Sequence, residues 1–149
     1  MASMTSFGQN AQITFDGRIY EAQIQIADKT MENGSCLIYT YCILSFGKDS
    51  VSVSYRREAH CNPSYLEANY KNLNEKSVAE KKKYLYTATN QMVRIENFQR
   101  YDFLPVQILI LTIKNKGEML VAKRKADDDL EGVFHFKGLV QTNTEENEK

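Results

Sequence analysis

Features that identify many enzyme classes are scarce or missing in this chain of 149 residues. Its seven glycines form no glycine-rich phosphate-binding loop, and no serine stands in a nucleophile elbow. The three cysteines and two histidines have neither C-x-x-C spacing nor the spacing of a zinc site. These absences favour a domain that binds over one that catalyses, with no cofactor and no metal.

An excess of charge is also missing, because 19 Lys and Arg residues balance 19 Asp and Glu residues. Such a chain has no overall field that attracts nucleic acid or an anionic membrane, so an electrostatic partner has to be recognised by a local patch. No apolar run approaches the ~20 residues that cross a bilayer, and the first residues lack the basic start and apolar run of a signal peptide. We therefore expect a cytoplasmic protein, or a nuclear one in a eukaryote, with no membrane partner.

The odd number of cysteines predicts a reducing compartment and no disulfide framework. Cys36 and Cys42 lie in an apolar, strand-like run, where a free cysteine behaves as a small core residue. Cys61 follows His60, but adjacent side chains of an extended segment point to opposite sides and make a poor chelate. We expect His60 and Cys61 to be loop residues that precede a helix.

The first part of the chain has the pattern of three β-strands. Glu21–Ile26 alternates polar and apolar residues, the run Cys36–Phe46 is almost wholly apolar, and Val51–Tyr55 alternates again. Met31–Gly34 and Gly47–Asp49 separate these runs and have the composition of tight turns. The pattern predicts a three-stranded antiparallel meander.

The later stretch Val106–Arg124 has two apolar runs on either side of Lys114–Gly117, which predicts a hairpin with a short polar turn. Its first arm is apolar on both faces, which is typical of a strand in the middle of a covered sheet. The two faces hold Val106, Ile108 and Ile110 on one side and Leu109, Leu111 and Ile113 on the other. A further strand is expected over Gly132–Val140.

Two helices are expected between these blocks of strands. Asn62-Pro63 is a good helix start, because Pro lacks only a donor that would be unpaired there. Ser77–Glu80 fits a capping box for a second helix. The apolar residues at helical spacing are Leu66, Tyr70 and Leu73 in the first helix, and Val78, Leu85, Ala88, Met92 and Ile95 in the second.

The expected order is therefore β-β-β-α-α-β-β-β, an α+β fold with a mainly antiparallel sheet, or a partly open barrel, covered by two helices. No Pro- or Ser-rich linker divides the chain. We expect a flexible N-terminus over residues 1–11, a single α+β domain over residues 12–141 and a disordered acidic tail over residues 142–149.

Three basic clusters with tyrosines nearby are the candidate binding residues. Basic residues among aromatic ones can hold a phosphate backbone while bases stack on the rings. The alternative is that each cluster is a solvated edge whose aliphatic stems cover apolar surface, and zero net charge favours this alternative. The candidates are Arg56, Arg57, Lys81, Lys82, Lys83, Tyr84, Lys123, Arg124 and Lys125.

Other polar residues have weaker functional patterns. His135 shares a strand face with Val133 and is expected to be half-exposed, since the sequence shows no nucleophile to pair with it. The acidic run Asp127–Glu131 lacks the spacing of a calcium-binding loop and is expected to be solvated. Tyr39 and Tyr41 share a face, where they line a pocket or a partner surface or pack at the edge of the core.

Two segments resemble known families. Leu109–Gly138, with ILTIKNKGEMLVAKRK and GVFHFKG, resembles the first hairpin and the following strand of a nudix hydrolase domain. The carboxylate motif that holds the metal of that family is absent, so the resemblance implies no catalytic residue. Gln99–Val106 resembles the entry to a PilZ-type cyclic-dinucleotide barrel, but the later motif of that family is also missing.

We conclude that the sequence favours a non-catalytic domain for protein–protein recognition or assembly, which binds another protein or itself. The first alternative is binding of single-stranded nucleic acid, RNA in particular, through the basic and tyrosine clusters. The second is a divergent nudix-like or nucleotide-binding domain without the catalytic carboxylates.

Overall fold

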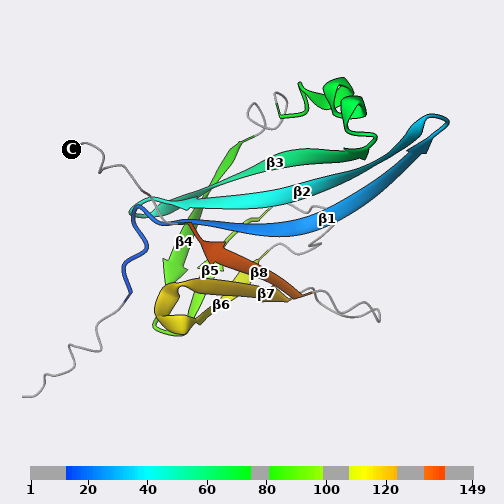
Figure 1. The fold of residues 1–149 in the computed structure, drawn as a ribbon. Coiled ribbons are helices and arrows are strands. Elements are labelled where there is room, and N and C mark those ends of the chain that lie inside the picture. The colour runs from blue at the N-terminus through cyan, green and yellow to red at the C-terminus, as the bar shows by residue number, and fades with distance from the viewer. Residues whose placement is uncertain (1–12, 75–80, 99–107, 124–132, 140–149) are drawn as a thin grey trace, which may run out of the picture.

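The computed structural model describes residues 13–74, 81–98, 108–123 and 133–139, which form a closed β-barrel (Figure 1). Each strand pairs antiparallel with the next one in the chain, and β8 pairs with β1 to close the ring. The strands are β1 (Ile19–Met31), β2 (Gly34–Phe46), β3 (Ser50–Asn62), β4 (Lys82–Ala88), β5 (Met92–Ile95), β6 (Leu109–Lys114), β7 (Met119–Lys123) and β8 (Val133–Gly138).

Apolar side chains fill the inside of the barrel. Strand alternation sends every second residue inward, so Cys42, Leu44 and Phe46 of β2 are buried while the residues between them are half-buried. A barrel of eight strands has an interior just wide enough for such side chains to fill. The core comprises Phe15, Tyr20, Ala22, Cys42, Leu44, Phe46, Val51, Val53, Val93, Ile95, Phe98, Leu109, Leu111, Leu120, Ala122 and Phe136.

The first three strands are much longer than the others and extend beyond the barrel (Figure 1). β1 pairs with β8 only at Tyr20 and Glu21, and β3 pairs with β4 only over residues 50–53. Beyond these positions β1, β2 and β3 continue as a three-stranded sheet that pairs with no other described strand. We call this part the projecting sheet and define it as residues 23–31 of β1, 34–41 of β2 and 56–62 of β3.

A disulfide and a short helix hold the far end of the projecting sheet. Cys36 and Cys61 are direct cross-strand neighbours and form a disulfide. The 3-10 helix η2 (Ser64–Tyr70) follows β3 and buries Leu66. Gly34 has a φ of +153°, and a side chain there would place its Cβ 2.8 Å from Leu66 Cδ1, so only glycine fits this turn.

The predicted α+β class is wrong, because no α-helix occurs in the part of the chain that the structure describes. The expected second helix is instead a hairpin of β4 and β5, in which Tyr84 and Tyr86 turn inward and Leu85 is 69% exposed. The expected first helix is only the 3-10 helix η2. Within the described residues, no helix has the length and apolar content that a membrane crossing requires.

Other predictions about single elements are confirmed. The meander of β1, β2 and β3 has its turns at the expected places, and the hairpin of β6 and β7 turns through the short 3-10 segment η3 (Asn115–Gly117). The two-sided apolar strand is β6, but only its inner face is covered, since Ile110 on the outer face is 43% exposed. The predicted flexible ends, residues 1–11 and 142–149, lie outside the described residues.

Candidate functional site

The outer face of the projecting sheet carries a regular grid of polar, aromatic and apolar side chains. Residues that lie directly opposite one another on neighbouring antiparallel strands point to the same face. A bulge between Gln23 and Gln25 keeps β1 in step with β2 on this face. From the barrel outward, the three rows are Gln23–Tyr41–Arg56, Ile26–Tyr39–Glu58 and Asp28–Leu37–His60.

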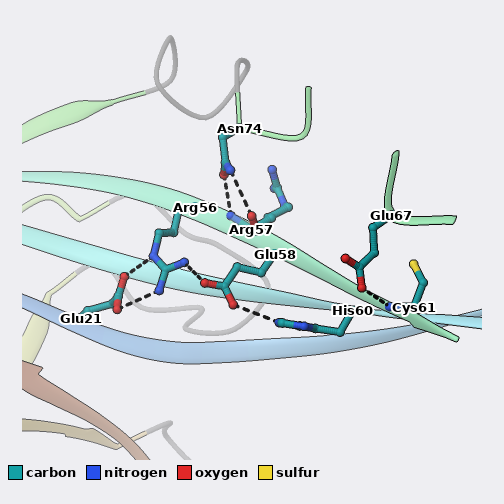
Figure 2. Close-up of polar contacts among 8 residues, drawn as sticks. All are labelled: Glu21, Arg56, Arg57, Glu58, His60, Cys61, Glu67 and Asn74. Carbon is teal, nitrogen blue, oxygen red and sulfur yellow. Dashed lines mark hydrogen bonds and ion pairs between the residues drawn. The ribbon is translucent and has the colours of Figure 1, made fainter. Parts of the chain in front are cut away.

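Arg56 lies in the row nearest the barrel, on the edge strand β3, and its contacts connect all three strands. Figure 2 shows its contacts with Glu21 and Glu58. Its guanidinium lies over the ring of Tyr41, 4.2 Å from the ring centroid, and reaches across β2 to Glu21 on β1. Nε donates to Glu21 Oε2 at 2.5 Å and Nη2 donates to Glu21 Oε1 at 3.2 Å, while Nη1 pairs with Glu58. A bidentate ion pair over an aromatic ring fixes the orientation of the guanidinium plane.

These contacts change the pKa values of the groups involved. The hydrogen bonds that Arg56 donates to Glu21 and Glu58 raise the pKa of Arg56 above its usual range. The hydrogen bond from Arg56, followed by that from His60, lowers the pKa of Glu58. Burial, followed by the charge of Glu58, raises the pKa of Tyr41, which therefore keeps its proton. These residues form the Arg56 cluster (Glu21, Tyr41, Arg56, Glu58 and His60), in which one guanidinium faces two carboxylates.

His60 extends the cluster toward the far end of the sheet. Its Nε2 lies 3.2 Å from Glu58 Oε1, and its ring meets the ring of Tyr39 edge to face with centroids 5.3 Å apart. The side chain is 60% exposed. The expectation that His60 and Cys61 are loop residues before a helix is wrong, because both lie in β3 on opposite faces of the sheet.

Two side chains cap the outer edge of β3, where no described strand pairs with it. Asn74 Oδ1 accepts from the backbone N–H of Arg57 at 2.6 Å, and Asn74 Nδ2 donates to the Arg57 carbonyl at 3.0 Å (Figure 2). The backbone N–H of Cys61 donates to Glu67 Oε2 at 2.9 Å. An unpaired strand edge is a template for unwanted pairing, and these caps occupy part of it.

The structure brings two of the three predicted basic clusters onto adjacent strands. Val53 of β3 lies opposite Lys82 of β4, so the lysines begin only three residues along β3 from Arg56. Lys81, Lys82 and Lys83 are exposed. Tyr84 points inward and packs against Phe98, with ring centroids 5.3 Å apart, so its ring is not free to stack on a base.

The third basic cluster lies elsewhere. Lys123 is the last residue of β7, which is separated from β3 and β4 by β5 and β6 on one side and by β8, β1 and β2 on the other. Arg124 and Lys125 lie outside the described residues. The candidate residues therefore do not form one continuous basic surface among the described strands.

Other predicted residues have clear positions. His135 lies in a strand, as expected, opposite Val121 on the outside of the barrel, but it is exposed where a half-exposed side chain was predicted. Cys42 is buried and free, and burial raises the pKa of its thiol, so it is a core residue, as predicted. Cys36, in contrast, forms the disulfide with Cys61, so the prediction that it is a free core cysteine is wrong. The acidic run Asp127–Glu131 lies outside the described residues.

Glu21, Ile26, Leu37, Glu58 and His60 were not among the predicted binding residues. The alternation within β2 places Leu37 on the same face as Tyr39 and Tyr41. The neighbouring residues of β1 and β3 on that face follow only from the pairing register, which includes the bulge in β1. In the described part of the chain, no group of three or more His, Cys, Asp or Glu side chains could hold a metal ion.

Comparison of the chain with protein-family models, with curated proteins and with solved structures finds no match in any of the three. The resemblances to nudix hydrolases and PilZ domains therefore gain no support. Since a fold alone does not specify a function, the function has to be inferred from the site.

Proposed function

We propose that the protein is a non-catalytic recognition domain that binds another protein through the outer face of its projecting sheet. The observation that carries this proposal is the Arg56 cluster, which holds charged and aromatic groups in fixed positions beside exposed aliphatic side chains. Ile26 is 51% exposed and Leu37 is 38% exposed, and both lie next to Tyr39 in the grid. Aromatic and arginine anchors among apolar contacts are typical of the centres of protein interfaces.

The charges on this face favour a polypeptide over a nucleic acid. Arg56 is neutralised by two carboxylates, so little of its charge is left for a phosphate group. Asp28 adds an exposed carboxylate to the same face. A partner that offers apolar side chains and a basic group would match this surface, whereas a phosphate backbone would be repelled by it.

Fixed side chains are an advantage for binding because little conformational entropy is left to lose. Ordering a long, mobile side chain in an interface costs about 0.5–1.5 kcal/mol. Arg56 is already held by the ring of Tyr41 and by two ion pairs before any partner arrives. The backbone beneath it is a sheet with a disulfide at its far end. These features support a preformed binding surface.

The test compares a variant of this face with a matched control. Ile26→Ser together with Leu37→Ser removes the exposed aliphatic groups, and Leu85→Ser removes an even more exposed one from β4. Self-association is measured by sedimentation at micromolar concentration, and binding of other proteins by crosslinking in extracts of the source cells followed by mass spectrometry. We expect the double variant alone to lose self-association or specific crosslinks. Equal behaviour of wild type, double variant and control would contradict the proposal.

The second candidate, binding of single-stranded nucleic acid, is favoured by the exposed Lys81, Lys82 and Lys83 around the start of β4, which pairs with β3 up to four residues before Arg57. A gel-shift titration at low and moderate salt separates the two candidates, because phosphate contacts weaken steeply as salt increases. Salt-sensitive binding that is lost in a Lys81→Gln/Lys82→Gln/Lys83→Gln variant would support this second candidate and count against the first.

The disulfide bears on the compartment in which the protein works. The expected cytoplasmic or nuclear location stays a prediction. The pair Cys36–Cys61 supports a different proposal, an oxidising compartment, since structural disulfides are rare in reducing ones. Alkylation and mass spectrometry of the protein from its source, without reduction, should find Cys42 as the free thiol. Alkylation of all three cysteines would contradict this proposal.

A further inference from the structure

A pocket of about 720 Å³ lies at the other end of the molecule, where the strand β1 begins and β8 ends. Its size falls in the range of small-molecule sites. The segment before β1, the turn between β6 and β7, and the end of β8 form its walls. Ile19, Met119 and Leu139 supply apolar surface, and Arg18, Lys137 and Glu118 supply charge.

Arg18 is held in a fixed position in this pocket. Its Nη1 donates to the Gly117 carbonyl at 2.9 Å and to the Tyr20 hydroxyl at 3.3 Å, and that hydroxyl donates to the same carbonyl at 2.5 Å. The guanidinium also lies 5.7 Å from the centroid of the Phe15 ring. Gly117 has a φ of +94°, and a Cβ there would lie 2.7 Å from Arg18 Nη1. The turn therefore needs glycine for two reasons: its backbone adopts a positive φ, and a side chain would occupy the space of the Arg18 guanidinium.

The charge of Arg18 is not balanced within the described part of the chain. Its hydrogen-bond partners are a carbonyl and a hydroxyl, both neutral. No described carboxylate lies within the 4.0 Å of an ion pair from Arg18 or from Lys137, although Glu118 lines the same pocket. Arg56, by contrast, has two carboxylate partners. A half-buried guanidinium with spare N–H groups favours an anion, and a planar carboxylate fits it best.

We propose that this pocket binds a small organic carboxylate, whose charged end contacts Arg18 and Lys137 and whose apolar part lies against Met119 and Leu139. The combination of two cations with one carboxylate gives the pocket a net positive charge. A bare inorganic anion would fit less well, because it has no apolar part to contact Met119 and Leu139. This site is separate from the projecting sheet, so the proposal is independent of the proposed recognition function.

The experiment varies charge and chain length separately. The full-length protein is titrated with hexanoate, acetate and 1-hexanol, while the backbone amide signals of Gly117 and Gly138 are followed by NMR. Hexanoate has both the charge and the apolar chain, and each of the other probes lacks one of them. We expect saturable shifts with hexanoate and at least tenfold weaker binding of both acetate and 1-hexanol.

Variants then assign the charge. Arg18→Met keeps the length of the stem and should weaken hexanoate binding about tenfold or more, whereas Arg94→Met, on the outside of β5, should leave it unchanged. The proposal is overturned if 1-hexanol binds as tightly as hexanoate, if no probe gives a saturable shift, or if Arg18→Met binds hexanoate like the wild type. The comparison of probes needs only the wild-type chain, so it decides the question even if Arg18→Met does not fold.

Discussion

The barrel and the projecting sheet are built from the same three long strands but are held in different ways. In the barrel, every strand has two neighbours. The inner faces of the strands together enclose a core of sixteen buried residues. In the projecting sheet, β1 and β3 each lose their outer neighbour, and the buried residues Cys36, Ile38 and Leu66 lie outside that core. Cross-links and caps therefore replace burial as the main source of order.

This difference separates stability from recognition within one continuous sheet. Burial of apolar area is the largest favourable term in folding, and the barrel supplies most of it. The projecting sheet is free to expose aliphatic and charged groups, because its shape depends on a disulfide, on the Arg56 cluster and on the caps of Asn74 and Glu67. Substitutions in the two regions should consequently differ in size and in reach.

The largest effect should come from the barrel core. Phe136 is fully buried, and Phe136→Ala should lower the free energy of unfolding by about 3–5 kcal/mol through lost burial and the remaining cavity. Chemical denaturation followed by circular dichroism measures this change. A loss below about 1 kcal/mol would mean that the barrel interior is not the main source of stability.

The second largest effect should come from the disulfide. Cys36 and Cys61 are 25 residues apart, and replacing both by serine should cost about 2–4 kcal/mol because the unfolded chain is no longer constrained. The structural change should stay local, with chemical shifts altered in residues 34–41 and 56–62 and not around Leu111. Disturbance of the whole barrel would show that the two regions are not separable.

Breaking the Arg56 cluster should have a smaller effect. Arg56→Met removes both ion pairs and leaves Glu21, whose side chain is only 16% exposed, without its partner. We expect a loss of about 1–2 kcal/mol. This is less than the cost of breaking a fully buried ion pair, because the site is partly solvated. The control is Arg94→Met, whose pair with Glu96 is exposed and should contribute little. Equal losses in the two variants would remove the special role of Arg56.

A weaker dependence on pH should follow from Glu58. Its folded pKa is lowered from the ordinary value of 4.5, so the pairing stabilises the fold above about pH 4.5 and is lost as the pH falls through the folded pKa. The side chain is 38% exposed, so solvent screening keeps the effect below about 1 kcal/mol. The stability difference between wild type and Glu58→Gln should shrink on acidification. A difference that grows toward acid would contradict the assignment.

The sequence predicts the meander of β1, β2 and β3 and the hairpin of β6 and β7, because turns and strand patterns depend on residues that are close together in the chain. Glycines and polar residues at 31–34, 47–49 and 114–117 mark turns wherever the strands lie in space. The class was wrong because Leu85, Ala88, Met92 and Ile95 also match helical spacing. In the structure Leu85 and Met92 are exposed and Ile95 is buried, so the apparent stripe mixes the two sides of a hairpin.

The candidate site depended on information that is not local. The run around Arg56-Arg57 was visible as a basic cluster, but its neutralisation by Glu21 required a pairing across two strands and 35 residues. The bulge near Gln23 shifts the register by one residue, and no residue pattern marks it. The disulfide likewise became visible only when the register placed Cys36 opposite Cys61.

Residue-resolved amide hydrogen exchange of the wild-type protein tests the central distinction most directly. The two halves of β2 serve as internal references for each other. We expect amides of Cys42–Phe46 to exchange only through global unfolding, and amides of Cys36–Tyr41 to exchange through a local opening of lower free energy. Equal protection along the whole strand would contradict the account, because it would make the barrel and the projecting sheet one cooperative unit.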